Sequence, residues 1–372
     1  MKAIIVGLWR KDQSESEVKD SLRELKGLVE AVGGKSVGYV LQSKNRPDSR
    51  YFIGEGKARQ LGEVARGTGA DAVVFDASLS PSQVRNLEKV IGRTVLDRTD
   101  LVLEIFSRRA KSKEAKLQVE LARLTHRLSR LHGRGRELSR LGGGVGTRGP
   151  GEQEVELRRR LIKKRIHRIK EELEEIKRRR RDQRKRRENA FKVALVGYTN
   201  AGKSTLMKAL TGRDTLVADM LFATLDTKTS SRSVSQDLKI LFTDTVGFIK
   251  NLPPELVESF KATLEEVTEA DALLHVVDVS DRGWLERVRI VEEILGELGA
   301  DGKPTLYVLN KVDLLVREES EINYVPHAAL VKGKAVVVSA GKGWGIDRLV
   351  DEILKLASVE KVQACGENRY EE

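Results

Sequence analysis

The chain has 372 residues, of which 40% are hydrophobic, 33% charged and 5% aromatic, so it can form two or three domains with aliphatic cores. Its net charge is +12, and its single cysteine, Cys365, excludes an intramolecular disulfide framework and indicates a reducing compartment, the cytoplasm. No run of about 18 apolar residues occurs, which argues against a membrane span. The apolar opening AIIVGLW is followed directly by charged residues, which argues against a signal peptide.

Residues 1–106 alternate short apolar runs with helical stretches, the order that is typical of a small parallel sheet with crossover helices. Gly54 and Gly56 precede a helical stretch whose start could hold an anion, but a plain turn is the simpler interpretation. The predicted strands are Ala3–Leu8, Ser36–Leu41, Ala72–Phe75 and Thr94–Leu96, and the predicted helices are Glu15–Val32, Lys57–Arg66 and Ser82–Ile91.

Residues 107–190 carry leucines and isoleucines at alternating spacings of three and four, which predicts two helices packed as an antiparallel coiled-coil hairpin. The second helix, from Leu157 to Arg187, would be about 46 Å long. A glycine-rich loop, 132–154, connects them, and a long loop of this kind is functional or disordered. The seam residues are Leu117, Leu121, Leu124, Leu128, Leu131, Leu157, Leu161, Ile162, Ile166, Ile169, Leu173 and Ile176.

The hairpin segment concentrates the positive charge of the chain. It holds 29 lysines and arginines against 12 acidic residues, a local net charge of +17, which leaves −5 for the rest. Arginines in a glycine-rich loop can contact phosphates and stack on unpaired bases, so we predict RNA binding there; a solvated helix surface with a flexible connection is the alternative. The predicted RNA contacts are Arg134, Arg136, Arg140 and Arg148.

A phosphate-binding loop follows the buried strand FKVALVG. The sequence GYTNAGKST (197–205) matches G-x-x-x-x-G-K-[ST] between a strand and a helix. Glycines let the loop amides point at phosphate oxygens, the lysine neutralises the β- and γ-phosphates, and the serine hydroxyl binds magnesium. The predicted nucleotide contacts are Gly197, Tyr198, Thr199, Asn200, Ala201, Gly202, Lys203, Ser204 and Thr205.

Two later strands end in residues that favour GTP over ATP. LKILFTDTVG (238–247) ends with Asp244, which can reach magnesium through water, and Gly247, whose amide can contact the γ-phosphate. In LYVLNKVD (306–313) a carboxylate can accept from both N1–H and the exocyclic amine of guanine, a donor pair that adenine lacks. With the strand VVVSA (336–340), the predicted guanine contacts are Asn310, Lys311, Asp313, Ser339 and Ala340.

The segment LFATLDTKT (221–229) is the predicted first switch, with Thr224 as the ligand of magnesium and the γ-phosphate and Thr227 as its competitor. Lys203, Thr224 and Gly247 are thus the predicted catalytic residues. Phe248 stands where many GTPases have a water-orienting glutamine, so intrinsic hydrolysis should be slow. We hypothesise that potassium near Asn200 supplies the missing assistance.

These motifs together resemble the HflX family of GTPases. The resemblance is carried by DRTDLVLEIFSRRAKSKEAKLQVELARL (97–124), GGGVGTRGPGE (142–152), GYTNAGKST, LFATLD, DTVGFIKNLP (244–253), HVVDVSD, NKVD and VSA, and it extends to about Ala357. It implies an N-terminal domain with an α/β part and a helical hairpin, then a GTPase domain. It also implies binding to rRNA of the large ribosomal subunit and GTP-dependent ribosome splitting or rescue under stress.

The predicted fold class is therefore α/β: a small parallel α/β subdomain, an antiparallel helical hairpin, and a P-loop GTPase domain (191–358) with a mixed, mostly parallel sheet, followed by a tail (359–372). The predicted activity is hydrolysis of GTP to GDP and phosphate by a monomer that uses Mg²⁺ and binds the ribosome. Two alternatives remain: an assembly or dormancy factor that binds the large subunit without splitting ribosomes, and an ATP-driven RNA helicase or chaperone.

Overall fold

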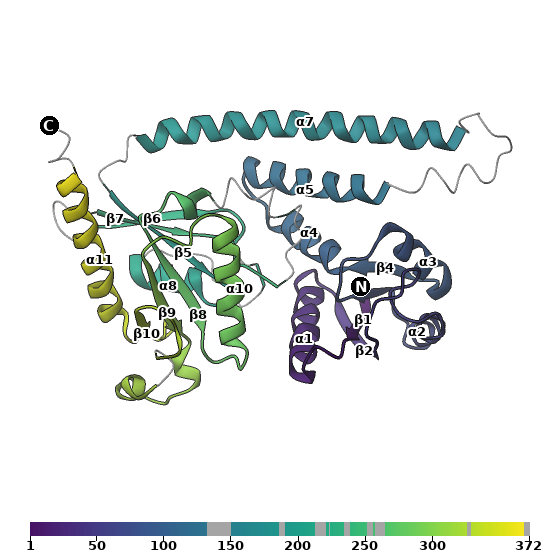
Figure 1. Ribbon diagram of the computed structural model, residues 1–372, viewed down its shortest axis with the longest axis horizontal. Helices are drawn as coiled ribbons and strands as arrows, with labels where there is room; N and C mark the ends of the chain where they lie inside the picture. The colour runs from purple at the N-terminus through teal and green to yellow at the C-terminus, as the bar shows by residue number, and fades with distance from the viewer. Residues whose placement is uncertain are drawn as a thin grey trace. The chain divides into compact units, whose positions relative to one another are not determined.

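The computed structural model describes residues 1–131, 150–185, 190–212, 221–222, 224–233, 239–250, 256, 265–325 and 329–367. They fall into two compact units (Figure 1). Unit 1 comprises Met1–Ile176 and Pro253–Ser259, and unit 2 comprises Lys177–Leu252 and Phe260–Glu372. None of the described helices combines the length with the apolar character that a membrane span needs.

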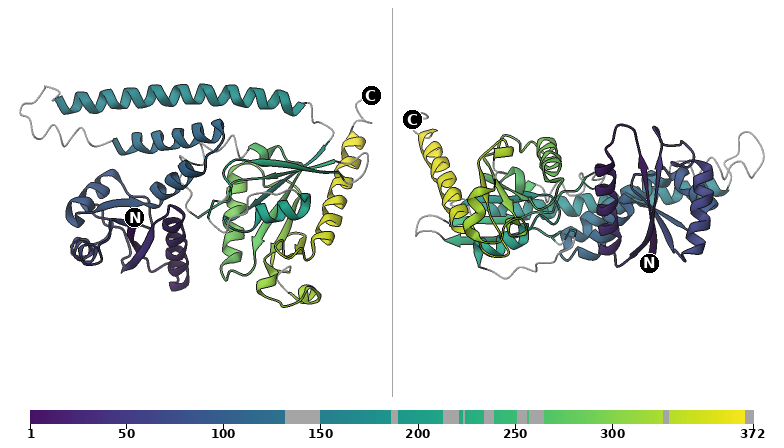
Figure 2. Two further views of the ribbon diagram at one scale, coloured as in Figure 1. Left: turned by 180° about the vertical axis from the view of Figure 1, so that it is seen from behind. Right: turned by 90° about the horizontal axis from the view of Figure 1, so that it is seen from below.

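Unit 1 contains a four-stranded sheet in the order β2-β1-β3-β4, and every pair in it is parallel. Helices α2 and α3 cover one face, where they pack on a buried apolar cluster, while α1 and α4 lie on the other (Figures 1 and 2). The predicted parallel sheet with crossover helices is thus confirmed. The elements are β1 (Lys2–Trp9), α1 (Glu15–Ala31), β2 (Lys35–Ser43), α2 (Glu55–Gly67), β3 (Ala72–Phe75), α3 (Pro81–Ile91), β4 (Thr94–Asp97) and α4 (Arg98–Arg109).

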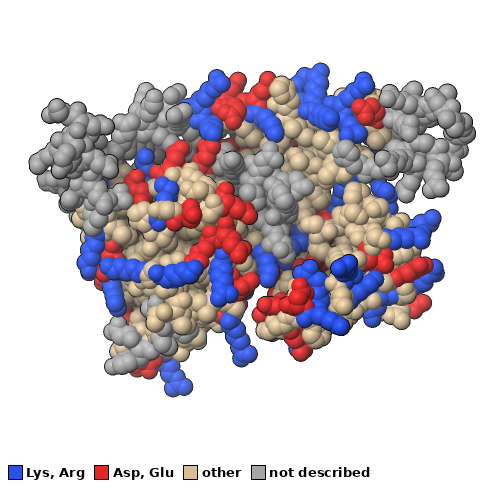
Figure 3. All heavy atoms as spheres, in the orientation of Figure 1, with Lys and Arg blue, Asp and Glu red and all other residues tan. Residues whose placement is uncertain are grey.

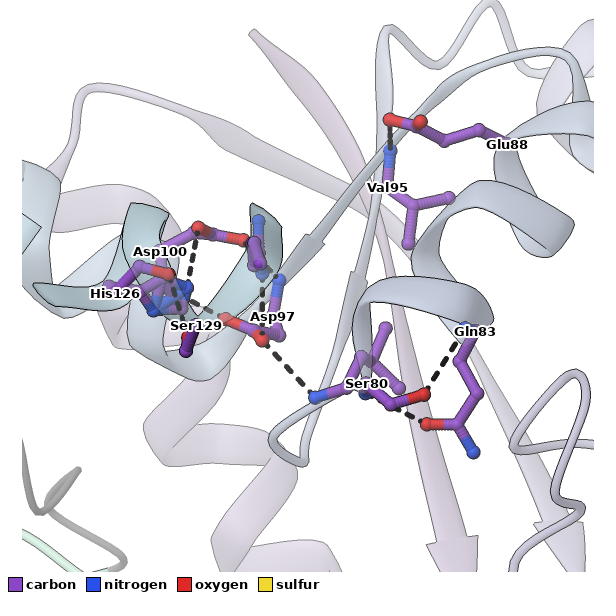
Figure 4. Close-up of polar contacts among 10 residues, drawn as sticks. Ser80, Gln83, Glu88, Val95, Asp97, Asp100, His126 and Ser129 are labelled. Atoms are coloured by element: carbon purple, nitrogen blue, oxygen red, sulfur yellow. Dashed lines mark hydrogen bonds and ion pairs between the residues drawn. The ribbon is translucent and has the colours of Figure 1, made fainter. Parts of the chain in front are cut away.

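Reciprocal capping hydrogen bonds fix the starts of α3 and α4 (Figure 4). The Ser80 hydroxyl accepts from the amide of Gln83, and the Gln83 side chain accepts from the amide of Ser80. Asp97 and Asp100 repeat the exchange at the end of β4, at 2.9 and 3.1 Å. Each exchange satisfies two amides that a helix start otherwise leaves without partners.

Two arginines, Arg98 and Arg130, pair with carboxylates at and near the carboxyl ends of β3 and β4. Arg98, with 3% of its side chain exposed, pairs with Glu24 and with Asp76. Arg130 donates to Asp97 at 2.9 Å and to Asp100 at 2.8 Å. Burial, with the charge of Asp100 as a second cause, nevertheless raises the pKa of Asp97 to about 6.

Helices α5 (Lys113–Leu131) and α7 (Pro150–Lys185) form the predicted antiparallel hairpin. Leu117, Leu121 and Ile169 are buried in their seam. Lys113 pairs with Glu172, and Glu120, seven residues later, pairs with Arg165, seven residues earlier, so the helices run in opposite directions. Most of α7 belongs to unit 1, and the helix continues into unit 2.

The prediction of a loop over 132–154 was wrong at its end, because the backbone from Pro150 onward is already helical. Proline is favoured in the first turn of a helix, where its missing N–H needs no partner, so Pro150 begins α7 rather than extending the loop. The plain turn is supported at Gly54, which caps α2 and donates its own amide to Gln42 at 2.9 Å.

Unit 2 contains a six-stranded sheet in the order β10-β9-β8-β5-β7-β6, parallel except for the β6–β7 pair at one edge. Helices α8 and α11 pack on one face and α10 on the other (Figure 2). The elements are β5 (Ala190–Gly197), α8 (Lys203–Thr211), β6 (Lys228–Ser233), β7 (Lys239–Asp244), β8 (Ala272–Asp278), α10 (Trp284–Glu297), β9 (Thr305–Asn310), the 3-10 helices η2 (Val312–Leu314) and η3 (Glu319–Tyr324), β10 (Ala335–Val337) and α11 (Ile346–Glu367).

Candidate nucleotide-binding site

The phosphate loop lies between the carboxyl end of β5 and the first turn of α8. Gly202, the residue before α8, has a φ of 93°, and a Cβ there would lie 2.3 Å from the side-chain nitrogen of Asn310. Only glycine fits this position, because the left-handed backbone and the close neighbour both exclude a side chain. The loop thereby delivers the amino end of α8 to the edge of the sheet, where helix amides favour an anion.

Lys203 is a buried cation whose partners are uncharged. Its side-chain nitrogen donates to the carbonyl oxygens of Gly197 at 3.1 Å and Tyr198 at 3.0 Å. Burial lowers the pKa of Lys203 to about 8, and the nearby charge of Asp244 opposes this shift. A phosphate would stabilise the charged form in the same way, so this arrangement favours binding of an anion.

Three oxygen-bearing side chains converge beside the lysine. The Ser204 hydroxyl lies 2.7 Å from Asp244 and 2.8 Å from the hydroxyl of Thr224, which itself donates to Asp244 at 3.0 Å. Burial raises the pKa of Asp244, while the charge of Lys203 and both hydroxyls lower it. The second carboxylate oxygen of Asp244 is buried without a hydrogen-bond partner in the described part of the chain. A small set of hard oxygen donors with an unused carboxylate oxygen fits Mg²⁺.

Asn310, at the end of β9, joins three loops of the site. Its side-chain nitrogen donates to the carbonyl of Ala201 at 2.9 Å, and its side-chain oxygen accepts from the amide of Ala340 at 2.9 Å. Asn310 therefore fixes the phosphate loop against the loop after β10. Ala340 is one of the predicted guanine contacts, and in this structure its amide is engaged by Asn310.

The carboxylate predicted to read guanine is held by the serine of the VSA motif. The hydroxyl of Ser339 donates to Asp313 at 2.6 Å and accepts from the amide of Lys342 at 3.2 Å. The amide of Ser339 pairs with the carbonyl of Trp344, so the hydroxyl, not the amide, is the group that Ser339 brings to the site. Lys311 has a φ of 64° and pairs with Asp278 at 2.8 Å.

The segment after β7 lies directly on the phosphate loop. The amide of Phe248 donates to the carbonyl of Gly197 at 3.1 Å, and the amide of Thr199 donates to the carbonyl of Phe248 at 2.7 Å. A Cβ on Gly247 would lie 2.7 Å from the Cα of Thr199, so glycine is required where the two backbones meet. The ring of Phe248 is 2% exposed and is part of the interior.

Some of the remaining predicted residues lie at or near the site, and the others lie outside the residues that the structure describes. Asn200 has a left-handed backbone with a φ of 62°, and Thr205 lies in the first turn of α8. Thr227 directly precedes β6, and the contacts described above involve Thr224 instead. The four arginines predicted to bind RNA, Arg134, Arg136, Arg140 and Arg148, lie outside the described residues.

Sequence reasoning missed His275, a fully buried residue of β8 near the phosphate loop. Its ring contacts the ring of Tyr307 in a tilted arrangement, with the centroids 5.2 Å apart. Burial, assisted by the charge of Lys203, lowers its pKa to about 3, so the ring is neutral at physiological pH. The strand ALLHVVD is buried throughout, and such a run gives no signal that one of its members lies near a ligand site.

Three family models together match most of the chain. One described as GTP-binding GTPase N-terminal matches residues 19–107, one described as GTP-binding GTPase Middle Region matches 109–187, and one described as 50S ribosome-binding GTPase matches 192–311. The boundaries of these matches follow the change from the small sheet to the hairpin and from the hairpin to the phosphate-loop unit.

Whole-chain relatives decide the family. GTPase HflX of Caldanaerobacter subterraneus subsp. tengcongensis is 46% identical over 354 residues, which cover 95% of this chain and 79% of the relative. GTPase HflX of Escherichia coli (strain K12) is 41% identical over 364 residues, which cover 97% and 84%. The chain belongs to the HflX family of GTPases. It therefore binds GTP and hydrolyses it.

A solved structure agrees with the fold of this HflX-family chain. The crystal structure of SsGBP in complex with GDP has a TM-score of 0.50 and 29% identity, and the match covers 96% of this chain and 99% of that one. The predicted fold class and the predicted HflX resemblance are both confirmed. Within the HflX-family chain, the strand-end loops of unit 2 are the place where the geometry suits a guanine nucleotide.

Proposed function

We propose that this HflX-family GTPase binds the large ribosomal subunit through rRNA and couples its GTP cycle to splitting or rescue of ribosomes under stress. The observation that carries the proposal is a strongly basic helical hairpin joined to a GTPase unit. The family model that matches residues 192–311 is described as a 50S ribosome-binding GTPase, which supports the same partner. We place this activity in the cytoplasm and expect a monomer.

The long helix α7 supplies the charge for an RNA partner. Its residues 155–179 include eleven lysines and arginines against five glutamates. Figure 3 shows blue side chains, with some red ones among them, along the middle of the top of the view, where Figure 1 places α7. Phosphate contacts of this kind bind RNA in a salt-dependent way. The exposed basic residues are Arg158, Arg160, Lys163, Lys164, Arg168, Lys170, Lys177, Arg178 and Arg179.

The proposed nucleotide cycle assigns each part of the GTP site one task. Lys203 and the loop amides bind the phosphates, and Asp313 accepts from the guanine edge. Ser204 and Thr224 would hold Mg²⁺ directly and Asp244 through water, and the ion would neutralise charge on the β- and γ-phosphates. Because Thr224 lies on the first switch, loss of the γ-phosphate would release that segment.

Hydrolysis in this site cannot use a polar side chain at position 248. Phe248 is buried and cannot orient water, so intrinsic turnover should be slow. We propose that potassium near the Asn200 side chain raises the rate. Faster hydrolysis in potassium than in sodium buffer would support this, and equal rates in both would refute it.

The proposal is tested by sedimentation with intact ribosomes and separate subunits. We expect the chain to co-sediment with the large subunit in the presence of a non-hydrolysable GTP analogue, and to bind less with GDP. A charge-reversed α7 variant, with Lys163, Lys164 and Arg168 changed to glutamate, should lose this binding. The matched control changes the exposed residues Arg66, Lys89 and Arg93 of unit 1 to glutamate and should bind as before.

Light scattering then separates splitting from binding. A fall in scattering when the analogue-bound protein meets intact ribosomes would support splitting. Co-sedimentation without a fall would support the assembly or dormancy role instead. Absence of co-sedimentation under every nucleotide condition would contradict the ribosome proposal, while leaving the GTPase activity untouched.

A further inference from the structure

Tyr198, the second residue of the phosphate loop, contacts the segment that follows Gly247. Its hydroxyl accepts a hydrogen bond from the backbone amide of Lys250 at 2.8 Å. Tyr198 is 5% exposed, and the bond is partly buried. A side chain of the phosphate loop that bonds the backbone of a second segment has a role beyond phosphate binding.

The ring of Tyr198 is itself held from the side of α10. The guanidinium of Arg287 lies over the ring, 5.0 Å from its centroid, and pairs with Asp281 at 2.8 Å. A cation over an aromatic face is attracted by the ring electrons and fixes the ring plane. The neighbouring Glu286 pairs with the side chain of Lys250 at 3.6 Å, so α10 contacts both members of the Tyr198–Lys250 pair.

The backbone contacts of Phe248 complete this connection. As the segment passes over the phosphate loop, Phe248 both donates to Gly197 and accepts from Thr199. These bonds and the Tyr198 hydroxyl hold the segment on both sides of Ile249. The segment is thus held by backbone and by Tyr198, whereas the buried ring of Phe248 offers no polar group to the reaction.

We propose that Tyr198 is a positioning residue for GTP hydrolysis: its hydroxyl keeps residues 248–250 on the phosphate loop, so that Gly247 stays where its amide can meet the γ-phosphate. The docked segment takes over part of the ordering that a glutamine at position 248 would supply. This inference rests on the predicted γ-phosphate role of Gly247 and on the GTPase activity, and it is independent of the ribosome proposal.

The test removes one oxygen atom, in Tyr198→Phe. The ring and its contact with Arg287 remain, so the loop should fold and bind GDP within about twofold of the wild type. We expect kcat for GTP to fall about three- to tenfold with little change in KM, which corresponds to one lost hydrogen bond. Hydrogen exchange with a bound GTP analogue should show the Lys250 amide exchanging about three- to tenfold faster.

Tyr307→Phe is the matched control. It also removes one tyrosine hydroxyl from unit 2, where that group donates to Glu292 at 2.6 Å on α10. Tyr307→Phe should lower thermal stability about as much as Tyr198→Phe does. It should leave kcat and the exchange rate of the Lys250 amide unchanged. Equal losses of kcat in both variants would mean that Tyr198 acts only through general stability, and the proposal would fail.

Two further outcomes decide the matter. A Tyr198→Phe variant with wild-type kcat would overturn the proposal, whatever its stability. In the wild type, a Lys250 amide that exchanges at the rate of an unprotected amide while the GTP analogue is bound would also overturn it, because the segment would then not be docked.

Arg287→Leu releases the ring of Tyr198 but keeps its hydroxyl. This variant should reproduce a smaller part of the kcat loss, about twofold.

Discussion

Both units carry a sheet that is wholly or mostly parallel, yet the carboxyl ends of their parallel strands are organised in opposite ways. In unit 1 the buried Arg98 and the partly buried Arg130 each pair with two carboxylates. In unit 2 the buried Lys203 donates to two backbone carbonyls. One set of strand ends has neutralised its own charges, and the other presents a cation to an incoming anion.

This difference separates strand ends with a structural role from strand ends that bind a ligand. The rule that ligands bind at the carboxyl ends of parallel strands applies to both sheets and does not distinguish them. The partners of the cation distinguish the two sheets. A cation that already lies between two carboxylates gains no stabilisation from a phosphate, whereas a cation with a lowered pKa and uncharged partners is stabilised by one. The predictions below test this comparison by disturbing one edge at a time.

The largest effect is expected at the phosphate loop. Lys203→Ala should lower the affinity for GTP on the order of a thousandfold, because two charged hydrogen bonds to phosphate are lost. Titration with a fluorescent nucleotide measures this affinity. Lys208→Ala, an exposed lysine on the same helix, is the control and should bind normally. A GTP affinity of Lys203→Ala within about tenfold of the wild type would remove the basis of the comparison.

At the other edge, Arg98→Met should destabilise unit 1 without affecting the nucleotide. It leaves Glu24 and Asp76 buried without their cation, and breaking a buried pair in this way costs about 3 kcal/mol. Urea unfolding followed by circular dichroism measures the loss. Arg23→Met removes an exposed pair with Asp20 and should change stability by less than about 0.5 kcal/mol. A large loss of GTP affinity in Arg98→Met would show that unit 1 is more than structural.

The carboxylate of the guanine site allows a change of specificity. Asp313→Asn replaces an acceptor pair by an amide that suits the O2 of xanthine, so GTP affinity should fall on the order of a hundredfold and XTP affinity should rise. Competition binding of GTP against XTP checks both directions. Because Ser339 holds the side chain at position 313, the amide should occupy the same place. Unchanged preference for GTP would refute the role of Asp313.

The smallest effect concerns pH and Asp97. Its pKa of about 6 in the folded chain exceeds its ordinary value of 3.8, so the folded state binds the extra proton. The stability contribution of Asp97 is therefore fully present below about pH 4 and is lost as the pH rises to about 6. The difference in unfolding free energy between wild type and Asp97→Asn should fall across this window by on the order of 2 kcal/mol. A difference in unfolding free energy that stays constant from pH 4 to 7 would show that the pKa of Asp97 is not raised in the folded chain.

Much of the fold could be predicted from periodicity, because apolar runs and helical seams reflect burial directly. Strand order could not be predicted: nothing local indicates that β1 lies between β2 and β3. Strand β6 was also missed, since KTSSRS lacks apolar alternation and is a strand because β7 supplies its hydrogen-bond partners. The start of α7 at Pro150 was concealed by the glycines around it.

The site was predictable where a motif carries its own chemistry. The phosphate loop, Asp244 and Asp313 follow from residue types at strand ends. The partners of Asn310, which link Ala201 and Ala340, could not be predicted, because they depend on how three loops meet. The same holds for the Tyr198 hydroxyl and the Lys250 amide, which are 52 residues apart.

The most direct test is calorimetric titration of the intact chain with GTP, GDP and ATP in the presence of Mg²⁺. If the strand ends of unit 2 bind phosphate and read guanine, GTP and GDP should give saturable heat with one site per chain, and ATP should give none. Equal binding of ATP and GTP, or no heat from either guanine nucleotide, would contradict the account.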